Sequence, residues 1–154
     1  MKWLAKEIET YLGAKEYVDT AVIPLYSISF GTEMTQSASN AEFISLLTNY
    51  LERQFTGRVL LFPPFTYLKN ENLENELTEI KKWEENIKKG EFKHIFYITS
   101  ESEWKMQEEN LDGSLIWLPS LPLEHLQDSQ KMAMIESQVK QILSLFTRKW
   151  KENL

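Results

Sequence analysis

The residues best able to bind a ligand or a partner follow stretches of this sequence that predict β-strands. Several are glutamates, whose carboxylates can exchange protons or hold Mg²⁺. The others carry hydroxyl, imidazole or aromatic groups, which suit hydrogen bonding or contact with a protein. Charged residues also keep the edge of a sheet in water, which is the competing interpretation of the glutamates. The candidate binding residues are Glu33, Ser37, Phe65, Thr66, Tyr67, Glu101, Glu124 and His125.

Ser37 lies in the polar stretch Gly31–Ser39, which leads into a predicted helix. The start of a helix attracts anions through its free N–H groups and its dipole, so a phosphate could bind there. Neither of the glycine-rich nucleotide-binding motifs, GxGxxG and GxxxxGK[ST], occurs in the sequence. Capping of the helix by Ser39 or Asn40 therefore explains these polar residues more simply than phosphate binding does.

The sequence shows no motif for a nucleophile or a metal. It has no GxSxG elbow, and Gly113-Ser114 precedes a predicted strand where a nucleophile would follow one. Cysteine is absent and there are two histidines, so we expect neither thiol catalysis nor a Cys- or His-built metal site. His94 begins a predicted strand and reads as structural, whereas His125 lies in a loop. We expect no catalytic residue, no metal and no cofactor.

The segment Pro63–Tyr67 is predicted to be a proline-stiffened loop with aromatic side chains. Aromatic residues on a stiff loop lose little conformational entropy on contact, and protein interfaces are rich in them. We therefore favour Phe65, Thr66 and Tyr67 as contact residues. The alternative is that Phe65 and Leu68 pack beneath neighbouring helices.

Short apolar runs between turn-forming residues predict the strands that would position these candidates. Arg58–Phe62, bounded by Gly57 and by Pro63-Pro64, predicts a strand buried on both faces and central in a sheet. Pro24 lacks an N–H, which favours an edge position or the start of a strand. We favour the strand order 2-1-3-4, with 3-2-1-4 as the alternative. The other predicted strands span residues 21–30, 92–99 and 114–118.

Apolar residues at helical spacing separate the predicted strands. Asn40 is predicted to start the second helix, and Gly57 to follow its end with positive φ. Gly90 is predicted to end the third helix. In the third helix, Glu76 fits the solvated face, whereas Glu84 fits either the solvated or the buried face. The predicted helices span residues 3–18, 40–56, 70–90 and 128–150, with a short one inside 100–110.

This alternation predicts an α/β fold with three layers, α/β/α, and a mostly parallel sheet of four or five strands, flavodoxin/Rossmann-like. The 154 residues fit a single domain, 1–154. Ligands of such sheets bind beyond the carboxyl ends of the strands, where we expect all the candidate residues. The four loops expected at that edge are Gly31–Ser39, Pro63–Lys69, Thr99–Glu103 and Pro119–Leu126.

The charge and hydropathy of the chain limit the partners and the cellular location that we expect for the protein. The net charge of −6 argues against non-specific nucleic-acid binding, which needs a basic surface. Charged residues in the first turns do not fit a signal peptide, and no stretch reaches the roughly 18 apolar residues of a membrane span. We therefore expect a cytoplasmic protein without stable membrane insertion. A protein partner or a homodimer is compatible with the aromatic content, and the chemistry of any small molecule stays open.

Three segments of the chain, Lys15–Leu25, Leu51–Arg58 and Leu61–Leu68, resemble the YpiF-like proteins, a family of uncharacterised bacterial proteins with a domain of unknown function. The resemblance covers most of the chain and implies a bacterial cytoplasmic protein. It carries over no activity, cofactor or site residue. From the residues themselves we favour a non-enzymatic binding or protein-interaction module. The alternative is a small-molecule or nucleotide-related enzyme with its site at the C-terminal ends of the strands.

Overall fold

A parallel five-stranded sheet forms the centre of the protein. The computed structural model describes residues 1–152, and its strands lie in the order β2-β1-β4-β5, with β3 also paired to β1. All of these pairings are parallel. The parallel α/β sheet and the favoured strand order are thus confirmed. The strands are β1 Thr20–Ile28, β2 Val59–Leu61, β3 Phe65–Leu68, β4 His94–Thr99 and β5 Ser114–Trp117.

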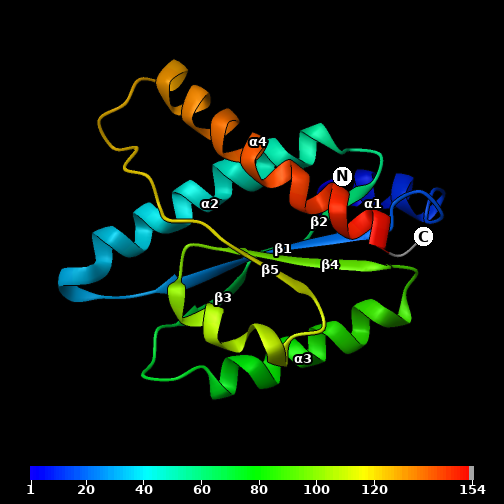
Figure 1. Ribbon diagram of the computed structural model, residues 1–154, viewed down its shortest axis with the longest axis horizontal. Coiled ribbons are helices and arrows are strands. Elements are labelled where there is room, and N and C mark those ends of the chain that lie inside the picture. Colours follow the sequence, from blue (N-terminus) through cyan, green and yellow to red (C-terminus); the bar gives the residue numbers. More distant parts are fainter. Residues whose placement is uncertain (153–154) are drawn as a thin grey trace.

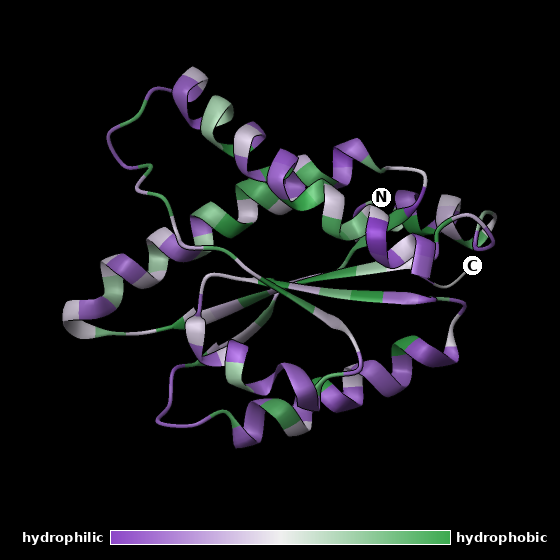
Figure 2. Ribbon diagram, in the orientation of Figure 1, coloured by the Kyte–Doolittle hydropathy of each residue, from purple (hydrophilic) through white to green (hydrophobic). Residues whose placement is uncertain are grey.

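Helices cover both faces of the sheet, which confirms the three-layer arrangement. In Figure 1, α2 (Met34–Gln54) and α4 (Asp128–Glu152) lie on one face, and α3 (Glu74–Lys89) lies on the other with the 3-10 helix η2 (Ser102–Asn110). Helix α1 (Ala5–Leu12) packs beside β2. Figure 2 shows hydrophobic residues concentrated in the strands and in the parts of the helices that face them. A short 3-10 helix, η1 (Gly31–Glu33), joins β1 to α2.

Successive residues of β1 face opposite layers of the fold. Val22 joins the apolar cluster beneath α2 and α4, whereas Ala21, Ile23 and Leu25 join the cluster against α3 and η2. Side chains alternate along a strand, so a strand covered on both faces has to be apolar at every position. The near-continuous apolar run of β1 meets this requirement.

Among the strands of residues 1–152, β2 pairs with β1 alone, so the expectation that residues 58–62 form the central strand is wrong. The outer side of β2 is nevertheless covered by the N-terminal segment. The Leu61 N–H donates to the Met1 carbonyl at 2.7 Å, and Lys2 forms a parallel bridge with Leu61. Tyr11 of α1 packs in the same cluster as Leu60. An edge strand covered in this way is as apolar as a central one, so its composition cannot separate the two positions.

Pro24 lies in the middle of β1, which has neighbours on both sides, so the prediction of an edge position or a strand start for it is also wrong. The Phe62 N–H donates to the Val22 carbonyl at 2.9 Å, so the backbone polar groups of Val22 face β2 and β3. Backbone direction alternates along a strand, so every second residue after Val22 faces the same side. Pro24 belongs to this set. The pairing with β2 ends at Val22, and the pairing with β3 resumes at Leu25. The missing N–H of Pro24 thus falls at a break in the neighbouring strand.

Helix α2 begins at Met34, several residues before the predicted cap Asn40. Ser37 and Ser39 therefore lie within the helix, and the loop predicted over residues 31–39 is mostly helical. The apolar stripe of this helix starts only at Phe43, so hydrophobic spacing gave no signal for the first turns.

The two glycines predicted to end helices had different outcomes. Helix α2 ends at Gln54, and Gly57 follows in a turn without the positive φ expected for it; within residues 1–152 a positive φ occurs at Gly31 (73°). Helix α3 ends just before Gly90, as predicted, and the Gly90 N–H donates to the Ile87 carbonyl at 3.0 Å.

Glu84 of α3 is buried, with 2% of its surface exposed, and it fixes the turn that precedes β5. Its Oε2 atom accepts hydrogen bonds from the Tyr97 hydroxyl (2.7 Å) and from the backbone N–H groups of Asp112 (3.0 Å) and Gly113 (2.9 Å). Burial raises the pKa of the Tyr97 hydroxyl, and its hydrogen bond to Glu84 adds to the rise. Glu76 is buried as well, contrary to its expected place on the solvated face.

Replacement of Glu84 by alanine is expected to lower the free energy of unfolding by about 3 kcal/mol, because a buried hydroxyl and two backbone N–H groups lose their acceptor. The exposed neighbour Glu85 provides the matched control, and Glu85→Ala should cost less than about 0.5 kcal/mol. Urea unfolding of both variants measures the difference. Equal losses in the two would contradict this role of Glu84.

Candidate functional site

A small polar pocket opens where β1, β3 and β4 end, at the edge of the sheet predicted to bind ligands. Its volume is about 140 Å³. The lining comes from the segment after β1, the first turns of α2, the residue after β3 and the segment after β4. We call these residues the strand-end pocket: Ser29, Glu33, Gln36, Ser37, Asn40, Lys69 and Glu101.

The fold brings three predicted residues, Glu33, Ser37 and Glu101, together in this pocket. Sequence reasoning missed Lys69 as a site residue, because a loop was expected where β3 lies. In the sequence, Thr66 stands between the aromatic residues Phe65 and Tyr67, which is typical of a strand, and a strand there puts Lys69 directly beyond its end. This pattern was the signal that could have identified Lys69.

Ser37 fastens the start of α2 to the end of β1. Its hydroxyl donates to the Ser27 carbonyl at 2.8 Å and accepts from the Ser29 N–H at 3.1 Å. Ser37 is buried, so both contacts are shielded from water. A hydroxyl engaged in this way positions the helix, and it would have to leave both partners to act as a nucleophile or to bind a phosphate.

Glu101 is the buried carboxylate of the pocket, with 8% of its surface exposed. Its Oε1 atom accepts a hydrogen bond from Asn40 Nδ2 at 3.0 Å, and its backbone N–H donates to Thr99 Oγ1 at 3.0 Å. The Gln36 side-chain amide donates in turn to Asn40 Oδ1 at 2.7 Å. This chain of contacts joins α2 to the end of β4 and fixes the orientation of the Glu101 carboxylate.

Lys69 supplies a positive charge beside these carboxylates. Its Nζ atom lies 3.4 Å from Glu103 Oε1 and 3.8 Å from Glu101 Oε2. Partial burial lowers the pKa of Lys69, but the carboxylates of Glu103 and Glu101 raise it, and the net direction is upward. Lys69 therefore keeps its proton at neutral pH and acts as a cation, not as a general base.

Phe65 and Tyr67 lie in β3 with their side chains buried, so the exposed aromatic loop predicted over Pro63–Tyr67 is wrong. The Trp104 indole N–H donates to the Tyr67 hydroxyl at 2.9 Å, and the Phe65 ring packs edge-on against Trp83. Burial raises the pKa of Tyr67, against the lowering effect of the hydrogen bond from Trp104. Thr66 points to the opposite side of the strand and is exposed. The alternative, that Phe65 and Leu68 pack beneath neighbouring helices, is therefore confirmed for Phe65. It is wrong for Leu68, which is exposed.

Glu124 and His125 follow β5 and are exposed, outside the lining of the strand-end pocket. A hydrogen bond from the backbone of Glu124 lowers the pKa of its carboxyl, and the Ser39 hydroxyl contributes in the same direction. His94 is buried at the opposite end of the sheet, where β4 begins, and burial lowers its pKa.

Within residues 1–152, no group of three or more His, Cys, Asp or Glu side chains is arranged to hold a metal ion. In the same part of the chain, none of the helices combines the length and the apolar character needed to cross a membrane.

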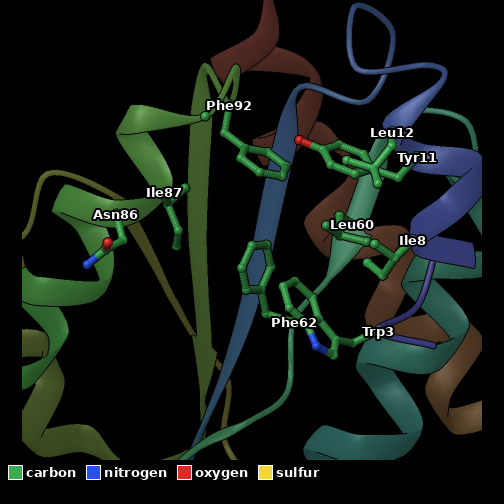
Figure 3. Close-up of a pocket in the computed structure, with 10 residues that line it drawn as sticks. Trp3, Ile8, Tyr11, Leu12, Leu60, Phe62, Asn86, Ile87 and Phe92 are labelled. Atoms are coloured by element: carbon green, nitrogen blue, oxygen red, sulfur yellow. The ribbon is translucent and has the colours of Figure 1, made fainter. Parts of the chain in front are cut away.

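A second hollow, the α1–α3 groove, is apolar and lies along β2 (Figure 3). Its volume is about 360 Å³. Trp3 and Phe62 lie together in the groove with ring centroids 4.9 Å apart, and Asn86 supplies a polar side chain on the α3 side. The groove offers apolar contact and little chemistry, and no predicted site residue lines it. Its lining residues are Trp3, Ile8, Tyr11, Leu12, Leu60, Phe62, Asn86, Ile87, Gly90 and Phe92.

Comparison with known proteins gives relatives without a described activity. Residues 9–150 match the family described as "Protein of unknown function (DUF2487)". The chain is 39% identical over 151 residues to the uncharacterized protein YpiF of Bacillus subtilis (strain 168), and the alignment covers 97% of this chain and 98% of that protein. No solved structure matches the chain. The resemblance to YpiF-like proteins is thus confirmed.

The free energy of unfolding is expected to fall as the pH rises above about 10, because the unfolded chain releases the tyrosine protons at their ordinary pKa while folded Tyr67 and Tyr97 retain theirs. Below that pH both states keep these protons, so the stability is fully present there. Each retained proton contributes a slope of about 1.4 kcal/mol per pH unit.

Urea unfolding across this pH range tests the Tyr67 contribution. Tyr67→Phe is expected to be less stable at neutral pH, because the Trp104 N–H loses its acceptor, and also to lose less stability as the pH rises. A slope identical to that of the unsubstituted protein would contradict the assignment.

Proposed function

Because this chain belongs to the DUF2487 family, whose description assigns no activity, we propose a role from the geometry of the strand-end pocket. The protein is a non-enzymatic module that binds a protein partner at this pocket. The partner would contact the polar groups of the pocket together with the apolar side chains beside it.

Exposed apolar side chains beside the pocket carry this proposal. Phe30 is 68% exposed and Met34 55%, and each is the chain neighbour of a pocket residue. Large apolar side chains left in water near fixed polar groups are typical of surfaces that bind other proteins. Association would remove these side chains from water, which is the favourable free-energy term that such contact supplies.

Ser37 and Glu101 of the pocket already bond to neighbouring groups, which favours binding over catalysis. The Ser37 hydroxyl has two backbone partners, and the Glu101 carboxylate is held by Asn40 and Lys69. Groups fixed in advance lose little conformational entropy when a partner arrives. They present a preformed surface in which the Ser37 hydroxyl and the Glu101 carboxylate are already engaged.

The charge around the pocket indicates the chemistry of the partner. The carboxylates of Glu33, Glu101 and Glu103 outnumber the Lys69 ammonium with which Glu101 and Glu103 pair. A partner surface with basic side chains around an apolar centre would complement this arrangement and avoid like-charge repulsion.

A small-molecule or nucleotide-related enzyme at the same edge is the second candidate, favoured by the convergence of Glu33, Ser37 and Glu101 in one pocket. The pocket volume of about 140 Å³ lies below the roughly 300–1,000 Å³ usual for small-molecule sites. Thr66 and Glu124, which this hypothesis also uses, lie outside the lining. A thermal-shift screen with nucleotides and phosphorylated metabolites separates the two, since a ligand at a hundredfold excess over its Kd stabilises by about 2.7 kcal/mol.

The double variant Phe30→Ser/Met34→Ser is expected to lose at least about tenfold in affinity for a partner captured by the unsubstituted protein and then purified, because two exposed apolar contacts are removed. Isothermal titration with the purified partner measures this loss. Leu145→Ser is the matched control, since Leu145 is an exposed apolar residue of α4 that does not line the pocket.

Two results would contradict the proposal. One is a partner bound equally well by the double variant and by Leu145→Ser. The other is a stabilising nucleotide or metabolite in the thermal-shift screen together with no captured partner, which would favour the enzyme.

A further inference from the structure

The outer edge of β3 is a row of backbone groups without strand partners. The Lys69 N–H donates to the Ile28 carbonyl at 3.0 Å, so Phe65, Tyr67 and Lys69 turn their backbone polar groups toward β1. Thr66 and Leu68 turn theirs away from the sheet. Within residues 1–152, β3 pairs only with β1, and neither Thr66 nor Leu68 has a backbone hydrogen bond on that outer side.

The other sheet edges are protected in ways that β3 is not. Met1 and Lys2 cover β2 through the hydrogen bond and bridge to Leu61. Beside β5, the Lys105 ammonium lies 3.5 Å from the centre of the Trp117 ring, and the cationic residues Arg148 and Lys149 line the same hollow as the strand. Charged side chains of this kind discourage pairing with another strand. The sequence from Val59 to Leu68 contains no charged residue.

The side chains of this edge are uncharged, and those on one face are exposed. Phe65 and Tyr67 are buried against the α3 layer, so Thr66 and Leu68 project on the α2 side, where Leu68 is 63% exposed. Trp104 holds the Tyr67 hydroxyl, so the strand is fixed before any partner arrives. An uncharged, rigid strand with open hydrogen-bonding groups is a template for a further strand.

We infer that two copies of this chain associate through their β3 edges, side by side and antiparallel about a two-fold axis near Tyr67. In this register the outward N–H and C=O groups of Thr66 in one copy exchange hydrogen bonds with those of Leu68 in the other, and the reverse pair follows by symmetry. The two five-stranded sheets then continue as one.

A second copy fits this edge because the edge is complementary to itself. Each copy offers the same outward donors and acceptors at Thr66 and Leu68, and the two-fold axis brings both Leu68 side chains onto the same face, where they leave water. Despite the net charge of −6 on each chain, the paired segments are uncharged, so no like charges meet within them. The inference does not depend on the partner proposed at Phe30 and Met34.

Sedimentation equilibrium from about 1 μM to 1 mM tests the inference. The average mass of the unsubstituted protein is expected to rise with concentration from 18.2 kDa toward twice that value. Thr66→Pro removes an outward N–H that the pairing with β1 does not use, and Leu68→Lys brings two ammonium groups together across the axis. Each is expected to weaken association at least tenfold while circular dichroism and the urea midpoint show a folded protein.

Leu145→Lys is the matched control, because it replaces leucine by lysine at an exposed position of α4 away from the β3 edge. This variant should associate like the unsubstituted protein. An unsubstituted protein that stays monomeric over the whole range would overturn the inference, as would association unchanged by both edge variants. A monomer that binds a different protein through Leu68 would also overturn it, because the edge would then accept a foreign strand. Loss of the Phe30 and Met34 partner with dimerisation intact would concern only the proposed function.

Discussion

Pairing of β1 with parallel strands on both of its sides is the constraint on which the rest of the structure depends. Strand β4 lies along one side, and β2 followed by β3 lies along the other. Because helices cover both faces as well, the strand is buried at nearly every position, from Thr20 to Leu25 without interruption. The α2–α4 layer and the α3 layer each acquire their apolar core from alternate residues of this strand.

The break in the neighbouring strand explains why a proline is tolerated at the centre of the sheet and where the strand-end pocket lies. Phe62 and Phe65 both direct their backbone polar groups toward β1. Residues of one strand that face the same neighbour normally lie an even number of positions apart, whereas Phe62 and Phe65 lie an odd number apart. The Pro63-Pro64 segment therefore acts like a bulge with one extra residue. It re-aims the chain, so that Lys69 emerges beside Glu101 and the outer side of β3 is left open.

The sequence was sufficient for the layers and the parallel sheet, because these follow from alternating strand and helix patterns. It placed Glu33, Ser37 and Glu101 at one edge, and the structure gathers them in one pocket. Sequence reasoning missed Lys69 because two prolines predict the end of a strand, whereas an extended segment resumes beyond them as β3. Local pattern also could not show that an apolar run such as Val59–Leu61 lies at an edge covered from outside.

Strand β3 bonds to β1 and, within residues 1–152, to no other strand, and this arrangement sets both the strand-end pocket and the open edge. Amide hydrogen exchange followed by NMR, at concentrations low enough for the monomer, measures this one-sided bonding residue by residue. We expect slow exchange at Tyr67 and Lys69, whose N–H groups face β1, and fast exchange at Thr66 and Leu68. Uniformly fast exchange over residues 65–69, or equally slow exchange at Thr66 and Leu68 in the monomer, would contradict this arrangement.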